Sequence, residues 1–260
     1  MTLTGFSGIV IILLFLGAMI AFYLTKRGSE TFQLREINSY RRLSREIRRA
    51  VESGTQLHVS LGWGGITSSE SASAFAGLSI LKQIIKESSI CDYPPVSSTG
   101  NAVVSILAQD TIQSTSQAIS INDQKSYSTG ELIALTPYSY AAGTLTSIRN
   151  PNISANVLSG WYGPEVIWLT SAAERQGTPI IAGTAQLPSQ AVMYASATDP
   201  LIGEELFVGG AYLGGGKIHE ASVNTQDIFR WVIIAVILLG AVLSLLGVAY
   251  PFQSLLGGAP

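Results

Sequence analysis

The protein has 260 residues, of which 47% are hydrophobic and 12% are charged, and its formal net charge is −2. Two histidines and one cysteine are too few for a Cys-rich or His-rich metal site, and a single cysteine excludes an intramolecular disulfide.

Two uncharged apolar runs lie near the ends of the chain, at residues 5–24 and 231–250. Each is about as long as the roughly twenty residues that a helix needs to cross a bilayer, so we expect two transmembrane helices. A cleavable signal peptide is the alternative for the first run. No basic residue precedes that run, and Lys26 and Arg27 follow it directly, which favours a retained anchor.

Basic residues cluster just after the first apolar run. Between Lys26 and Arg49 there are eight basic and three acidic residues, and Arg230 lies at the inner end of the second run. The positive-inside rule then predicts that both termini are outside and that the main domain is cytoplasmic. A lone Cys91 agrees with a reducing compartment.

Residues 26–53 are predicted to be a basic amphipathic helix beside the membrane, because apolar residues recur every three or four positions and Gly54 can end the helix. Its arginines can bind anionic membrane lipids, or its apolar stripe can pack as a stalk on a neighbouring subunit. No nucleic acid is expected, since no aromatic platform or recognition motif accompanies the arginines. The predicted lipid contacts are Arg35, Arg41, Arg42, Arg45, Arg48 and Arg49.

The body of the chain, residues 54–223, alternates between strand-like and helix-like segments. This alternation predicts an α/β domain with a mainly parallel sheet and flanking helices. Thr136 and Pro137 are expected to start a helix, and Gly177 to end one. Extended segments are expected at 55–63, 94–99, 131–135, 155–161, 178–185 and 204–214, and helices at 68–89, 100–113, 136–148, 164–177 and 187–197.

The body is also poor in charge. Twenty of the 180 residues from 50 to 229 are charged, less than half of the roughly 25% usual for soluble domains. A surface rich in Ala, Gly and Ser suits packing against another protein. We therefore expect a homo-oligomer or a larger complex with other membrane proteins.

Two stretches, "SLGWGGITSSES" and "VLSGWYGPEVIW", each run strand, Gly-Trp, Gly, helix. The segments that contain them, 55–118 and 153–213, continue alike, which suggests a duplicated βαβα unit. The corners can be tight structural turns with a buried ring, or they can hold a small anionic ligand at a helix N-terminus. Neither matches the Gly-x-Gly-x-x-Gly fingerprint, so the structural interpretation is favoured. The residues of this possible ligand corner are Gly62, Trp63, Gly64, Gly160, Trp161 and Gly163.

Residues that could support catalysis are few. The glycines before Lys217 do not fit a P-loop, because the first glycine and the final Ser or Thr of that motif are missing. His58 lies in an apolar segment and is expected to be a hydrogen-bonded core histidine, and no local signature supports its pairing with Cys91 as a nucleophile. We expect no catalytic, cofactor-binding or metal-binding residues.

The stretches "EELFVGGAYLG", "QDIFRW" and "RQGTPIIAGTAQLPSQAVMYASATD" resemble a family of bacterial membrane proteins known only as a domain of unknown function. The resemblance extends over most of the chain. It implies a two-span α/β protein in the bacterial inner membrane, and it implies no activity.

Together these patterns predict a membrane-anchored structural or scaffold protein. A membrane-tethered module that binds or senses a small ligand is the alternative, and an enzyme is the least favoured class.

Overall fold

The structure is a computed structural model that describes residues 3–25, 35–68, 70–88, 94–119 and 130–245. The chain divides into two compact units. Residues 35–215 form one unit, which is an α/β domain, and residues 1–34 with 216–260 form the other.

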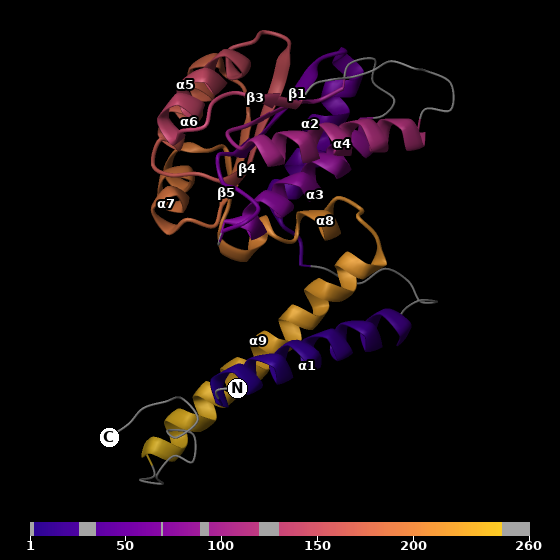
Figure 1. Cartoon of the computed structure of the whole chain (residues 1–260), viewed down its shortest axis with the longest axis vertical. Coiled ribbons are helices and arrows are strands. Elements are labelled where there is room, and N and C mark those ends of the chain that lie inside the picture. Colours follow the sequence, from indigo (N-terminus) through magenta and orange to yellow (C-terminus); the bar gives the residue numbers. More distant parts are fainter. Residues whose placement is uncertain (1–2, 26–34, 69, 89–93, 120–129, 246–260) are drawn as a thin grey trace. The chain divides into compact units, whose positions relative to one another are not determined.

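The α/β domain is built on one six-stranded sheet with the order β3-β2-β1-β4-β5-β6 (Figure 1). Every pair of neighbouring strands is parallel. The chain therefore runs from the centre to one edge of the sheet, returns to the centre and runs to the other edge, which is the order of a doubly wound fold. The strands are β1 (Gln56–Gly62), β2 (Val96–Thr99), β3 (Gly130–Leu132), β4 (Ile153–Trp161), β5 (Ile180–Thr184) and β6 (Asp199–Leu201).

Helices cover both faces of the sheet. Figure 1 shows α5, α6 and α7 on one side and α3 and α4 on the other. The central strands are buried along nearly their whole length, as expected for a parallel sheet between two helical layers. The helices of the domain are α2 (Asn38–Ser53), α3 (Ser71–Glu87), α4 (Ala102–Ile119), α5 (Pro137–Ile148), α6 (Val166–Gln176), α7 (Leu187–Ser196), the 3₁₀ helix η1 (Gly203–Leu206) and α8 (Gly209–Tyr212).

Several predicted helix ends are confirmed. Thr136 is the N-cap residue of α5 and Pro137 its first residue. Gly54 and Gly177 end α2 and α6 in the left-handed conformation, with φ of 65° and 70°. The predicted start at Ser68 or Ser69 is wrong in detail, since α3 begins at Ser71 after Glu70; Ser69 itself lies outside the described residues.

The basic helix α2 is part of the α/β domain. It begins at Asn38, later than predicted, and its apolar stripe is buried in the same chain at Tyr40, Leu43, Ile47 and Ala50. The Tyr40 hydroxyl donates a hydrogen bond of 2.5 Å to the Glu205 carbonyl oxygen. The stripe thus covers its own sheet, against β1, β4 and β6.

The strand predicted at 204–214 is wrong. The position beside β5 is taken by Asp199–Leu201, and the predicted segment forms η1 and α8. A Cβ atom at Gly209 would lie 2.5 Å from the Ile80 side chain, so this segment packs closely on α3 in place of joining the sheet. Glu204 and Glu205 consequently lie in a helical turn.

The two segments predicted to be repeats have the same order of elements. Residues 55–118 contain β1-α3-β2-α4, and residues 153–213 begin with β4-α6-β5-α7. This order is common to both halves of any doubly wound sheet, so the internal duplication stays a prediction.

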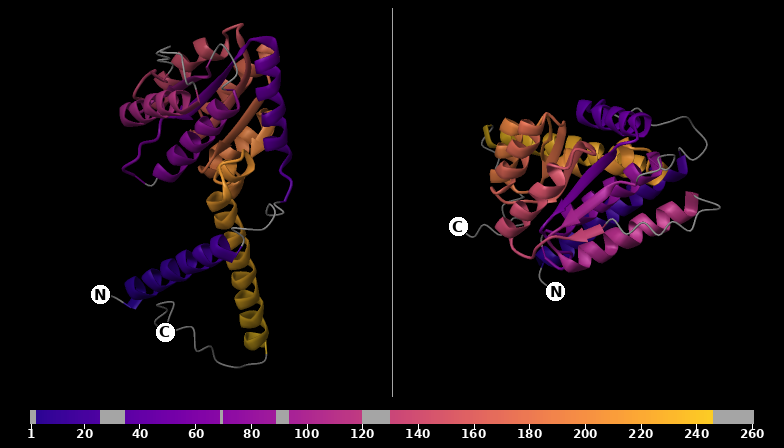
Figure 2. Two further views of the ribbon diagram at one scale, coloured as in Figure 1. Left: turned by 90° about the vertical axis from the view of Figure 1, so that its right-hand side faces the viewer. Right: turned by 90° about the horizontal axis from the view of Figure 1, so that it is seen from above.

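The second unit contains two long apolar helices, α1 (Leu3–Thr25) and α9 (Lys217–Leu245), drawn indigo and yellow in Figure 2. The Phe15 and Phe229 rings, 5.4 Å apart between centroids, connect them. Within the described residues, one segment is long and apolar enough to cross a membrane, Lys217–Leu243, with a mean hydropathy of 2.0. The apolar part of α1, Gly8–Leu24, is shorter, so the prediction of two spans is not confirmed.

Candidate functional site

The two Gly-Trp corners lie side by side at the carboxyl ends of the central strands. Gly62 at the end of β1 is in register with Trp161 at the end of β4, and the Trp63 amide donates a 3.1 Å hydrogen bond to the Trp161 carbonyl oxygen. In a doubly wound sheet, ligands bind in the crevice where the strand order reverses, which here is between β1 and β4. The six predicted corner residues are therefore brought to the usual ligand position of this fold.

The backbones of the two corners are in close contact at this position. A Cβ atom at Gly62 would lie 2.3 Å from the Trp161 carbonyl oxygen, and one at Gly160 would lie 2.0 Å from the Leu61 carbonyl oxygen. At Gly64 it would meet the Trp161 side chain at 2.5 Å. Since these glycines let two backbone turns touch, the geometry favours the structural interpretation of the corners over the ligand interpretation.

A buried carboxylate, Glu165, joins the two corners. Its Oε1 accepts hydrogen bonds from the Trp63 indole Nε1 at 2.8 Å and from the Gly163 amide at 2.7 Å, and the residue is 4% exposed. Trp63 is thus held by the residue that precedes α6. Sequence reasoning missed Glu165, because an acidic residue before a helix is ordinarily a solvent-exposed first-turn residue.

A polar network runs through the core beside the corners. His58 on β1 is fully buried, with Nδ1 3.0 Å from the Asn156 amide oxygen and Nε2 2.9 Å from the Ser98 hydroxyl. The Asn156 amide nitrogen donates to the Thr178 hydroxyl at 3.1 Å, which turns the amide oxygen toward His58 and places the imidazole proton on Nδ1. Burial lowers the pKa of His58 to about 4, so the ring is neutral at pH 7. The expectation of a hydrogen-bonded core histidine is confirmed.

Two buried tyrosines continue the network toward the corners. The Tyr140 hydroxyl lies 2.5 Å from the Ser60 hydroxyl, and the Tyr162 hydroxyl donates to the Ser60 carbonyl oxygen at 2.6 Å. Burial raises the pKa of both tyrosines. With both nitrogens of His58 engaged and the phenols held neutral, these groups are suited to fixing the core, and none is an available base. Cys91, the other member of the pair considered above, lies outside the described residues.

The six predicted lipid-contact arginines have different surroundings. Arg35 pairs with Glu205 at 3.0 Å, Arg41 with Glu36 at 3.2 Å and Arg42 with the buried Asp199 at 3.2 Å. Arg48 interacts with Glu87 of α3. Burial raises the pKa of the Glu87 carboxyl above its usual value, and the positive charge of Arg48 partly offsets this rise. Arg45 and Arg49 line a cavity together with Arg42.

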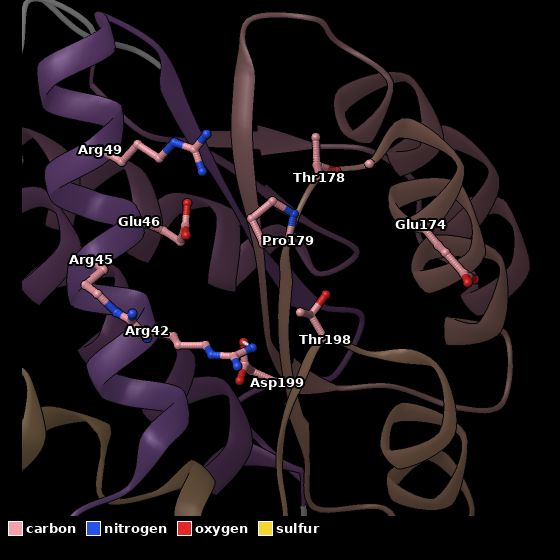
Figure 3. A pocket seen from close by; sticks show the side chains of 10 residues that line it. Arg42, Arg45, Glu46, Arg49, Glu174, Thr178, Pro179, Thr198 and Asp199 are labelled. Carbon is pink, nitrogen blue, oxygen red and sulfur yellow. Dashed lines mark hydrogen bonds and ion pairs between the residues drawn. The ribbon is translucent and has the colours of Figure 1, made fainter.

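This cavity has a volume of about 560 Å³ and lies between α2 and the amino ends of β5 and β6 (Figure 3). Figure 3 shows Arg42, Glu46 and Arg49 extending from α2 toward the strands. Its lining residues are Arg42, Arg45, Glu46, Arg49, Glu174, Gly177, Thr178, Pro179, Thr198 and Asp199. Throughout the described part of the chain, no group of three or more His, Cys, Asp or Glu side chains could hold a metal ion.

The sheet order and the long apolar helix define a class: a doubly wound α/β domain joined to a helix able to span a membrane. Residues 2–255 match the model of one protein family, described as a domain of unknown function (DUF6754), and the chain belongs to that family. The resemblance to a domain of unknown function is thereby confirmed. No curated protein and no solved structure matches the chain.

Proposed function

We propose that this protein is a membrane-anchored assembly protein whose α/β domain binds a second copy of itself through the carboxyl edge of its sheet. The proposal rests on an apolar rim at the same edge of the sheet as the corners, consisting of Val103, Leu135, Tyr138, Ile167, Trp168 and Leu187, all 41–76% exposed.

The rim follows from the topology. Each of its residues lies in the first turn of a helix that follows a strand, or in the loop before it, and these turns all lie at the carboxyl edge of a parallel sheet. The Tyr138 and Trp168 rings are in contact, with centroids 5.7 Å apart, so α5 and α6 share one apolar surface. Exposed apolar side chains grouped in this way are typical of protein-binding surfaces.

The composition of the rim favours a second copy as the occupant. All six side chains are uncharged, so two copies can meet through this edge without like-charge repulsion. Trp and Tyr, two of the residue types that contribute most to binding at interfaces, are both present. Close contact between the ends of β1 and β4 accounts for the corner glycines without a ligand, which supports assembly over ligand binding at this edge.

The membrane anchor is part of the proposal. Lys217–Leu243 has the length and hydropathy of a span, and α1 supplies a second apolar helix of 23 residues. The ends of the α/β domain are adjacent, since the Tyr212 hydroxyl donates to the Arg35 carbonyl oxygen, as two flanking anchors require.

We place the protein in the bacterial inner membrane, with two spans, both termini outside and the α/β domain cytoplasmic. Lipid contact by the α2 arginines and contact with other membrane proteins belong to the same proposal.

A charge introduced at the rim tests the proposal. We expect Leu187→Glu to dissociate the full-length protein in mild detergent, because a contact between two copies receives the charge twice. The substitution should leave folding intact, since Leu187 is 76% exposed and begins α7, where an acidic residue is favoured by the helix dipole. The measurement is the protein mass by light scattering.

The control is Tyr194→Glu, a charge added to another exposed side chain of α7, 72% exposed and near the opposite end of the helix. It should keep the mass of the unchanged protein. An assembly that survives Leu187→Glu as fully as Tyr194→Glu would place the interface elsewhere and overturn the proposal.

A further inference from the structure

The cavity beside α2 holds charges of both signs, and its charges are only partly paired. Arg42 is paired with Asp199. Arg45 and Arg49, by contrast, form no ion pair with any residue in the described ranges. Two guanidinium groups therefore face the cavity with donors available for an oxyanion.

A carboxylate oxygen in the same wall lacks a donor. Glu46 Oε2 is buried and has no hydrogen-bond partner among the described residues. A buried, unpaired carboxylate oxygen costs free energy and calls for a donor group. Glu46 follows Arg42 by four residues and precedes Arg49 by three, so it shares their side of α2.

The hydroxyls of Thr178 and Thr198, in the opposite wall of the cavity, already have partners and do not supply the donor that Glu46 lacks. Thr178 Oγ1 already accepts from Asn156 and donates to the Ala173 carbonyl oxygen at 3.3 Å. Thr198 Oγ1 accepts from the Ile180 amide at 3.2 Å. Glu174 points away from α2 in Figure 3. The protein thus presents donors from Arg45 and Arg49 beside an unmatched acceptor on Glu46.

We propose that this cavity binds a zwitterion that carries an oxyanion and an ammonium group a few bonds apart, the oxyanion on Arg45 and Arg49 and the ammonium on Glu46. A simple anion would pair with the arginines but would be repelled by Glu46. A simple amine would pair with Glu46 but would be repelled by the arginines. The volume of about 560 Å³ is within the range of small-ligand sites. The site lies at the amino edge of the sheet, away from the apolar rim, and does not depend on the proposed assembly.

The same chemistry occurs in soluble phosphoethanolamine and in the headgroup of phosphatidylethanolamine. The test is calorimetric titration of the full-length protein in mild detergent with O-phosphoethanolamine. Inorganic phosphate and ethanolamine, the anionic and cationic halves of this molecule, are titrated separately for comparison. We expect O-phosphoethanolamine to bind at least about tenfold more tightly than either half, since each half leaves a buried or cavity-facing charge unpaired.

Matched variants assign the contacts. Arg49→Gln and Glu46→Gln should each weaken O-phosphoethanolamine binding about tenfold or more, with circular dichroism confirming the fold. Arg48→Gln removes the neighbouring arginine that interacts with Glu87 and should bind like the unchanged protein. Absence of binding would overturn the proposal. So would phosphate that binds as well as O-phosphoethanolamine and gains affinity in Glu46→Gln, which would identify a plain anion site.

A final arm identifies the source of the ligand. The protein is placed in nanodiscs of phosphatidylglycerol alone or with phosphatidylethanolamine, and the titration is repeated. Weaker binding of O-phosphoethanolamine in the nanodiscs that contain phosphatidylethanolamine would mean that the lipid headgroup competes for the cavity, which supports the proposal with a lipid headgroup as occupant. Equal binding in both supports it with a soluble zwitterion.

Discussion

At the scale of single residues, several buried polar groups of the core form one connected hydrogen-bond network. His58, Asn156 and Ser98 link three neighbouring strands through hydrogen bonds of 2.9 and 3.0 Å. A buried polar group is stabilising only when its partners are present, so such a network specifies strand register as well as stability. Its cost is sensitivity to acid, because protonated His58 would be a buried charge.

This sensitivity is testable. The pKa of His58 is about 4 in the folded protein and about 6.5 in an unfolded chain. The unfolded state therefore binds a proton first as the pH falls, so the contribution of His58 is full above about pH 6.5 and decreases toward pH 4. Linkage predicts a loss of about 3 kcal/mol of unfolding free energy over this window.

The measurement is chemical denaturation in mild detergent at several pH values, followed by tryptophan fluorescence. His58→Gln is the comparison, since it lacks the titrating ring while all carboxylates remain. The unchanged protein should lose more unfolding free energy than His58→Gln between pH 6.5 and 4. Equal losses would show that His58 is not buried neutral.

The sequence predicted the buried role of His58 but not the role of Glu165 or the cavity, and the difference has a physical reason. The burial of His58 is visible from its apolar neighbours on one strand. Glu46 and Asp199, by contrast, belong to segments about 150 residues apart in the chain, and only the return of the chain to the β6 edge brings them into one wall.

At the scale of elements, local patterns predicted most helices and strands because their periodicity and end residues agree with the tertiary structure. The segment 204–214 is the exception, since alternating apolar and small residues also suit a helical turn that packs on α3. The arginine-rich pattern of α2 revealed an apolar stripe, but only the fold shows that this stripe is buried on the domain's own sheet.

The Gly-Trp corners provide an element-scale prediction. Gly160→Ala should destabilise the domain by about 3 kcal/mol, because the added Cβ would lie 2.0 Å from the Leu61 carbonyl oxygen and the β1 and β4 ends must separate. Gly65→Ala is the control. Its Cβ would meet only the end of the Asn101 side chain, at 3.0 Å, and should cost about 1 kcal/mol or less.

Thermal and chemical unfolding of the two variants in parallel would check this difference. Comparable stability in both would mean that the two corners do not touch as described.

At the scale of the whole molecule, two features combine: a long apolar helix, and an α/β domain that exposes apolar side chains at the carboxyl edge of its sheet. Sequence reasoning predicted the fold class, because alternating strands and helices of this length allow few other arrangements. The rim could not be predicted, since its six residues are scattered from Val103 to Leu187 in the chain and only the fold brings them to one edge of the sheet.

Self-assembly of the protein is tested by the mass of the full-length protein extracted in mild detergent, measured by light scattering and corrected for bound detergent. A defined oligomer, a whole multiple of the 27.5 kDa chain, is the predicted result. A monomer at all protein concentrations would show that the protein does not assemble with itself, and the apolar rim would then require a different partner.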